Sequence, residues 1–244
     1  AEFDSPETIA LVGGILRSLG HAVTAIDVSG SVARLASRLE RLRPDLVFNM
    51  AEGRRGRFRE AFYPALFEQL GFRHTGSTAS VLALCLDKVL TKRVVAAAGV
   101  CVARDRIVHR ADDLESEDPA MTAPAVIVKP NYEGSSMGIT QASVIEGRDG
   151  GRVRDVVKAT LERYPEGVLV EEYIDGVDVS VGWVEGLGVL PTIGYDYRPS
   201  GRHRIMDLAL KQGPPIPYAI PAPLDDGTAK RLEKAGATAF SALG

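Results

Sequence analysis

The sequence predicts an α/β protein, because short apolar runs alternate with amphipathic helical patterns along its first third. Residues 22–28 and 45–50 form apolar runs bounded by turn residues, as expected of buried strands. Helical patterns precede, separate and follow these runs, at residues 6–19, 31–44 and 58–71. Strands and helices in this order favour a parallel, Rossmann-like sheet with helices on both faces over residues 1–84.

Local signals set the ends of the helices. The first helix has Asp4 or Ser5 as its candidate N-cap and Pro6 in its first turn. Pro64 is expected to start or kink the third helix. A long helix is predicted over residues 80–99, with Gly99 as its C-terminal cap.

The rest of the chain continues the mixture of strands and helices. An acidic surface loop at 111–124 precedes the predicted strands 125–130 and 167–174, the helix 151–164, a hairpin over 178–198 that turns at Glu185 to Gly188, and the helix 225–244. Residues 198–217 are polar and without periodicity, which is typical of a long functional loop. No strand precedes the first helix and nothing follows the last, so we expect a fragment that lacks outer parts.

Composition excludes several classes of protein. The 29 basic and 32 acidic residues leave a net charge of -3, which disfavours nucleic acid and acidic membranes as partners. Cys85 and Cys101 lie in apolar surroundings without a C-x-x-C pattern and are predicted to be buried, reduced thiols. The start of the chain is acidic, and no stretch approaches the roughly 20 apolar residues of a membrane span. We therefore expect a cytoplasmic protein.

A lysine followed by a glycine- and serine-rich loop is the first candidate site. Lys129 ends a predicted strand, and Gly134, Ser135, Ser136 and Gly138 follow it. A fixed cation together with loop amides and hydroxyls can bind phosphates. The alternative is a surface turn with an ordinary exposed lysine. Neither a Walker A loop nor a G-x-G-x-x-G fingerprint is present.

The second candidate is an acidic strand, VEEYIDGVDVSV. Adenine needs an acceptor for its amino group and a backbone donor for its ring nitrogen, whereas ribose needs a carboxylate. Glu171, Tyr173 with Ile174, and Asp178 can fill these roles in order. The alternative is an edge strand with solvated acids.

The third candidate is a pair of lysines, Lys88 and Lys92, which lie four residues apart on one helix face. Such a pair usually marks a solvated surface, so only the companion motifs assign a function to Lys88.

Taken in order, the segments LDKVLTK, VKPNYEGSSMGI and VEEYIDGVD resemble the ATP-grasp fold, and most closely its D-alanine–D-alanine ligase branch. HTGS at 74–77, GYDY at 194–197 and IPAPL at 220–224 extend the similarity over nearly the whole chain. The resemblance implies a pre-ATP-grasp domain at 1–84, a central ATP-grasp subdomain at 85–175, and the start of an incomplete C-terminal subdomain at 176–244.

The resemblance also implies a role for each matching residue. Lys88 and Lys129 would hold the phosphates of ATP, and the loop from Glu133 to Gly138 would close over them. Glu171 would accept from the adenine amino group, and the backbone at Ile174 would meet the ring. The remaining implied site residues are Gly134, Ser135, Ser136, Tyr173, Asp178 and Tyr195, of which Ser135 and Tyr195 would be catalytic and Asp178 would face the ribose.

Three departures from the family pattern concern the substrate and the metal. Residues 49–60 replace the family's H-G-x-x-G-E-D-G stretch, and Ser200 and Gly201 replace a lysine and a tyrosine of the mobile loop. Arg198, Arg202 or Arg204 is the candidate for the missing charge. Family Mg²⁺ ligands lie in an R-x-D and E-x-N region expected beyond Gly244, so no metal ligand is assigned here.

The function implied is that of an ATP-dependent ligase, which activates a carboxylate as an acyl phosphate and joins it to an amine. Amino acids or small peptides would be the substrates, and a homodimer is a further implication of the resemblance. An inactive or regulatory ATP-binding module is the alternative. The hypothesis requires Lys88, Lys129 and Glu171 to converge around one nucleotide.

Overall fold

The computed structural model describes residues 5–114, 122–197 and 201–244 of the chain. It divides into two compact units, residues 1–83 and 84–244. Part of the loop expected at 111–124 lies outside the described residues, as do Arg198 and Ser200.

The first unit is built on helices: α1 (Pro6–Ser18), α2 (Val32–Leu42), α3 (Arg59–Gln69) and most of α4 (Ala79–Leu86). Ser5 is the N-cap of α1, as predicted, and its hydroxyl accepts from the Thr8 amide at 3.2 Å. Pro64 lies inside α3 instead of starting it. The core of this unit joins buried side chains of α2 and α3, namely Leu35, Leu39, Tyr63 and Phe67.

The two buried strands expected in this unit are wrong. Residues 22–28 form no strand, and within 45–50 only Val47 makes a bridge, a parallel one to His74. Ile26 and Val28 do pack against the α2–α3 core, so their apolar character reflects burial. A strand also needs a neighbouring backbone to pair with, and residues 22–28 have none among the residues described.

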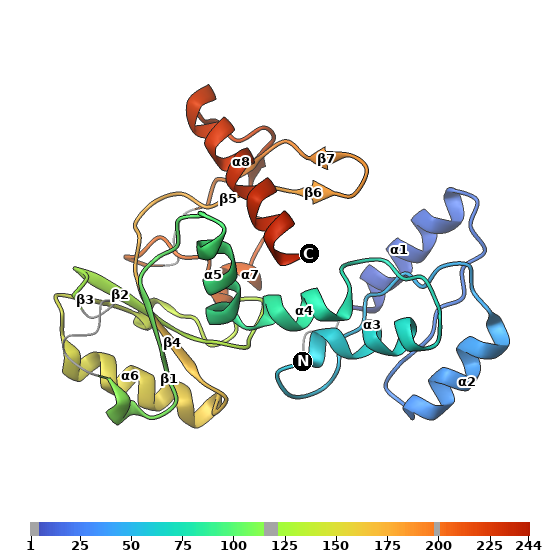
Figure 1. Cartoon of the computed structure of the whole chain (residues 1–244), viewed down its shortest axis with the longest axis horizontal. Coiled ribbons are helices and arrows are strands. Elements are labelled where there is room, and N and C mark those ends of the chain that lie inside the picture. The colour runs from blue at the N-terminus through green and yellow to red at the C-terminus, as the bar shows by residue number, and fades with distance from the viewer. Residues whose placement is uncertain (1–4, 115–121, 198–200) are drawn as a thin grey trace. The chain divides into compact units, whose positions relative to one another are not determined.

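The second unit contains a four-stranded antiparallel sheet in the order β1-β4-β2-β3 (Figure 1). Its strands are β1 (Asp105–Val108), β2 (Ala125–Pro130), β3 (Val144–Glu146) and β4 (Val168–Glu172). The predicted strands at 125–130 and 167–174 are therefore confirmed, whereas β1 and β3 were not anticipated.

The two faces of this sheet differ in chemistry. Helix α6 (Gly150–Arg163), predicted from its periodicity, covers one face with Val153 and Val157. The strand residues in the same core are buried valines at 108, 126, 128, 168 and 170. Because side chains alternate along a strand, the intervening residues point to the opposite face. Asp105, Lys129 and Glu171 are among them, on the side of the sheet away from α6.

The helix expected over 80–99 is broken, because Asp87 separates α4 from α5 (Lys88–Ala97). Asp87 has φ -79° and ψ 96° and caps α5 by accepting from the Leu90 amide at 3.0 Å. Its carboxylate also accepts from Asn131 Nδ2 at 2.8 Å and from the Tyr132 hydroxyl at 2.9 Å. Gly99, at φ +90°, ends α5 as predicted.

The remaining elements are short, apart from the last helix. A three-stranded sheet has the order β5-β8-β9, and β6 pairs with β7 in the predicted hairpin. The bounds are η1 (Ala111–Asp113), η2 (Gln141–Ser143), β5 (Val179–Ser180), β6 (Trp183–Val184), β7 (Gly188–Val189), β8 (Ile193–Tyr195), α7 (Leu208–Lys211), β9 (Tyr218–Ala219) and α8 (Asp226–Leu243). Helix α7 lies within the loop expected at 198–217.

The expected burial of both cysteines is wrong. Cys85 is half-buried in α4, and Cys101 is exposed. Cys101 follows the end of α5 in the connection to β1, and connections run over protein surfaces. Within the described residues, no helix combines the length and hydropathy that crossing a bilayer requires.

The break at Asp87 yields a prediction about stability. Asp87→Ala removes the cap and leaves the buried Asn131 amide and the Tyr132 hydroxyl without their acceptor. We expect the free energy of unfolding to fall by about 2–3 kcal/mol in a urea titration. Asp149→Ala, which removes only the cap of α6, should cost about 1 kcal/mol. Equal losses in the two variants would contradict the linking role of Asp87.

The effect of Asp87 should also depend on pH. Burial alone would raise the pKa of Asp87, but hydrogen bonds from Asn131, the Leu90 amide and Tyr132 outweigh it and lower this pKa. The ionised form therefore stabilises the fold above the unfolded-state pKa of about 4. We expect the difference between wild type and Asp87→Ala to shrink as pH falls below that value.

Candidate functional site

Four charged side chains form a connected network on the face of the sheet opposite α6. Lys129 Nζ lies 2.6 Å from Glu171 Oε1, and Lys92 Nζ lies 2.5 Å from Glu171 Oε2. The same Lys92 ammonium lies 2.9 Å from Asp105 Oδ2. The Asp105 side chain is 1% exposed, and those of Lys92 and Glu171 are each 13% exposed. Glu171 is thus held between two cations.

Strand register brings these residues together. Asp105 pairs directly with Glu171 between β1 and β4, and Lys129 pairs with Leu169 between β2 and β4. Because β4 lies between β1 and β2, side chains from all three strands meet on one face. Helix α5 supplies Lys92 from above that face.

The two lysines control the charge of Glu171. Burial by itself would raise the pKa of this carboxyl group. The charges and hydrogen bonds of Lys129 and Lys92 outweigh burial and hold the pKa of Glu171 below its usual value. Glu171 is therefore an anion at neutral pH and can only accept hydrogen bonds.

Lys88 begins α5 and contacts the segment that follows β2. Its Nζ donates to the Glu133 carbonyl at 2.5 Å and to the Asn131 carbonyl at 3.2 Å. The structure thus places Lys88 beside the start of the glycine- and serine-rich loop, a few residues after Lys129 in the sequence. Asn131 Oδ1 also accepts from the Val89 amide at 3.1 Å, which fixes α5 to this end of β2.

The glycine- and serine-rich loop has an unusual backbone. Ser135 and Ser136 have φ values of +44° and +59°, and Gly138 has φ +77°. Ser136 Oγ donates to the Met206 carbonyl at 2.5 Å, and the Leu208 amide donates to the Ile139 carbonyl at 3.3 Å. The loop therefore lies against residues 206–208 of the long polar segment.

The predicted adenine and ribose residues lie at and beyond the end of β4. Ile174 is 66% exposed, and within the described residues its amide makes no hydrogen bond to protein. The Tyr173 hydroxyl donates to the Arg204 carbonyl at 3.3 Å and accepts from the Arg204 amide at 3.1 Å. Tyr173 thus connects β4 to the same polar segment.

Asp178 and Tyr195 have partners of their own. Asp178 accepts from the Tyr197 hydroxyl. Burial and this bond raise the pKa of Tyr197. The Tyr195 hydroxyl hydrogen bonds with Ser180 Oγ at 3.0 Å. Both predicted residues thus take part in side-chain hydrogen bonds within residues 178–197.

The arginine candidates also differ in their surroundings. Arg202 is exposed and lies 2.6 Å from Glu146. The Arg204 guanidinium lies 6.0 Å from the centre of the Tyr197 ring. Arg198 falls outside the described residues. Within the part of the chain that the structure describes, no group of three or more His, Cys, Asp or Glu side chains could hold a metal ion.

Two residues of the network and the cap of α5 escaped prediction. Lys92 was assigned no role, although its position one turn after Lys88 was a signal. Asp105 was missed because the four-residue strand DRIV is half polar and has no clear alternation. Asp87 was missed because the apolar helical pattern continues across it.

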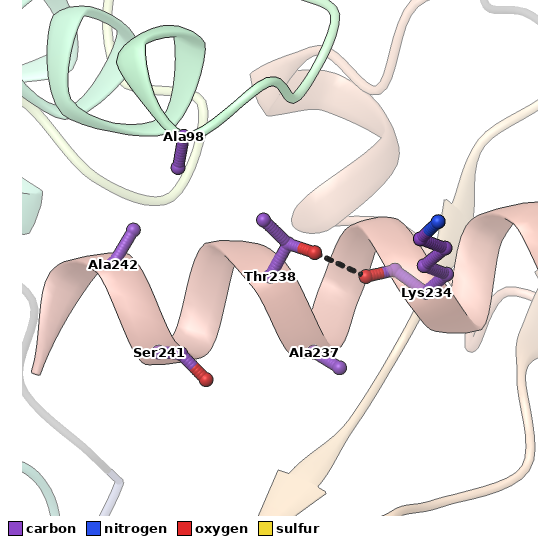
Figure 2. Close-up of a pocket in the computed structure, with 6 residues that line it drawn as sticks. All are labelled: Ala98, Lys234, Ala237, Thr238, Ser241 and Ala242. Carbon is purple, nitrogen blue, oxygen red and sulfur yellow. Dashed lines mark hydrogen bonds between the residues drawn. The ribbon is translucent and has the colours of Figure 1, made fainter.

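A shallow hollow of about 470 Å³ lies elsewhere in this unit, between α8 and the end of α5. Small or polar side chains line it, and Thr238 Oγ1 donates to the Lys234 carbonyl at 2.8 Å (Figure 2). None of the predicted site residues lies in it.

Lys88 lies on helix α5, Lys129 and Glu171 lie on the paired strands β2 and β4, and the glycine- and serine-rich loop follows β2. This arrangement is typical of ATP-grasp proteins. Solved structures support this fold. The D-alanine–D-alanine ligase of Bacillus anthracis complexed with ATP aligns with a TM-score of 0.70 at 17% identity, covering 99% of this chain and 75% of that one. The VanG D-Ala:D-Ser ligase of Enterococcus faecalis aligns with a TM-score of 0.61 at 24% identity, covering 82% and 56%.

Sequence comparison identifies the family. The family described as "D-ala D-ala ligase C-terminus" matches residues 94–244. A D-alanine–D-alanine ligase of Caulobacter sp. (strain K31) is 34% identical, covering 97% of this chain and 71% of the relative. One of Agrobacterium fabrum is 31% identical, covering 99% and 75%. The chain belongs to the D-alanine–D-alanine ligase family.

The glycine- and serine-rich loop yields a prediction at Gly138. A Cβ at this position would lie 2.7 Å from both Pro130 Cγ and Tyr164 Cε2, in addition to the positive φ. Gly138→Ala should lower the free energy of unfolding by about 3 kcal/mol in chemical denaturation. Gly147 has the same φ of +77° but open space around it, so Gly147→Ala should cost about 1 kcal/mol. Similar losses would show that packing at Gly138 contributes nothing.

Proposed function

We propose that this protein is an ATP-dependent carboxylate–amine ligase that joins amino acids through an acyl phosphate. The observation that carries the proposal is the Lys129–Glu171 pair, with the glycine- and serine-rich loop and Lys88 at the same end of β2. Phosphoryl transfer depends mainly on positioning and charge neutralisation. Lysines, loop amides and one fixed acceptor are the groups that this chemistry needs.

In the proposed complex, Lys129 and Glu171 contact different parts of the nucleotide. Lys129, which pairs with Glu171 in this structure, would turn its ammonium group to a phosphate, and Lys88 would contact the phosphates from α5. Glu171 would then accept from the adenine amino group, and the Ile174 amide would donate to the ring. Asp178 would face the ribose. A bound nucleotide would therefore replace the Lys129–Glu171 ion pair, and Glu171 would keep Lys92 as its cation.

The loop would exclude water from the acyl phosphate. Residues 133–138 would cover the phosphates, with Ser136 on the phosphate side and Ser135 on the substrate side. Hydrogen bonds from Ser136 and to Ile139 connect this loop with residues 206–208. Two segments that close together protect a hydrolysable intermediate better than one.

The substrates would be amino acids, with D-alanine first among them because the relatives are D-alanine–D-alanine ligases. Residues 49–60 and the loop residues Ser200 and Gly201 differ from the family's substrate-side motifs. Another amino acid or a small peptide is therefore also a candidate substrate. We place Mg²⁺ with the nucleotide phosphates and assign it no ligand from the described residues. Tyr195 remains a proposed catalytic residue, as does Ser135.

The finer organisation follows the family. We propose that residues 1–84 form a pre-ATP-grasp, Rossmann-like domain, that 85–175 form the central subdomain, and that 176–244 belong to the C-terminal subdomain. A cytoplasmic location and a homodimeric state complete the proposal.

The proposal predicts the effect of Lys129→Met in the complete protein. Loss of the ammonium group should reduce substrate-dependent ADP release by about 100-fold or more, as expected when a charge-stabilising donor is removed. A coupled assay scanned over D-alanine and pairs of amino acids measures this. Lys158→Met, on the exposed face of α6, is the matched control and should retain activity. ATP binding without ADP release by the wild type would instead support an inactive module.

A further inference from the structure

Two carboxylates lie directly opposite each other across β1 and β4. Asp105 and Glu171 are register partners, and both side chains are nearly buried. Like charges at directly opposed positions destabilise an antiparallel pair. Lys92 Nζ lies between them, at 2.9 Å from Asp105 Oδ2 and 2.5 Å from Glu171 Oε2. One ammonium group thus contacts both buried acids.

The partners of the two carboxylates differ. Asp105 Oδ1 also pairs with Arg93, at 3.0 Å, whereas Glu171 Oε1 pairs with Lys129 at 2.6 Å. If Lys129 turns to a phosphate, as the proposed function requires, Glu171 loses that partner. Lys92 is then the cation that keeps Glu171 ionised beside Asp105.

We propose that Lys92 is a positioning residue of the nucleotide site, which fixes the Glu171 carboxylate as an anionic acceptor without itself binding the nucleotide. This inference rests on the proposed function. It explains why α5 carries two lysines one turn apart: Lys88 faces the loop after β2, and Lys92 faces the paired strands.

The charged groups around Glu171 determine how pH should act. Those in contact with the Asp105–Glu171 pair, among the residues described, are Lys92 and Arg93 from α5 and Lys129 from β2. Removing the charge of Lys92 leaves two carboxylates to share a buried site, which raises the pKa of one of them. Glu171 is the group that gains the proton once Lys129 has turned away. In a protonated Glu171, one oxygen carries a proton and donates instead of accepting from the adenine amino group. The fraction of the protein in this form grows as pH falls, so the affinity for the nucleotide falls with it.

The test is the dissociation constant for Mg-ATP in Lys92→Met, divided by that of the wild type, at pH 8 and at pH 6. The ratio removes the titration of ATP itself. We expect this ratio to be about tenfold larger at pH 6 than at pH 8. One protonation of Glu171, followed over about one pH unit below its pKa, changes the affinity by this factor. Lys92→Arg should restore the wild-type profile at both pH values.

A second variant separates positioning from folding. In Lys92→Met with Asp105→Asn, the opposing charge is gone, so the pH dependence should return towards that of the wild type. If Lys92→Met fails to fold, Lys92→Gln takes its place, because glutamine keeps a neutral donor between the carboxylates. It should show the same pH dependence that we expect of Lys92→Met. Lys158→Met on α6 is the control for the substitution itself.

The outcomes distinguish the two levels of the hypothesis. A ratio that does not change with pH in Lys92→Met or Lys92→Gln would overturn the role of Lys92. So would a double variant that binds more weakly than the single one at pH 6. A wild-type protein that binds no Mg-ATP at either pH would overturn the proposed function, and the role of Lys92 with it.

Discussion

The Glu171 carboxylate is shared between an ammonium group from helix α5 and one from strand β2. A buried carboxylate is tolerated only when cations and hydrogen bonds compensate for its lost hydration. This requirement explains the arrangement of the sheet. Strand β4 must lie between β1 and β2, and α5 must lie over the face opposite α6, so that Lys92 and Lys129 both reach one side chain. The valines beneath provide a rigid support.

The break at Asp87 serves the same arrangement. A continuous helix would leave the first turn of α5 without free amides, and Asp87 could not cap it. With the break, Asp87 holds Asn131 and Tyr132 after β2, and Lys88 starts a helix beside the glycine- and serine-rich loop. The cap therefore connects α5, which carries both lysines, to the strand that carries Lys129.

Local motifs encode some parts of this site, and these can be read from the sequence. Lys129 and Glu171 lie at the ends of short apolar runs that predict strands, and a loop rich in glycine and serine follows Lys129. The role of Lys92 depends on the register between β1 and β4, which no local pattern contains. The same limit explains residues 22–28, where apolar side chains indicated burial but could not show whether another backbone would pair with them. The helix break at Asp87 was hidden because apolar residues continue on both sides.

The departure at residues 49–60 is a structured one. Arg59 is buried and pairs with Glu52 at 3.3 Å, and the Gly53 amide donates to the Arg59 carbonyl at 2.6 Å. A Cβ at Gly53 would lie 2.9 Å from that carbonyl, so glycine is required for the close approach. Residues 49–60 therefore form an ordered segment, which the Arg59–Glu52 ion pair and the close approach of Gly53 to the Arg59 carbonyl hold together.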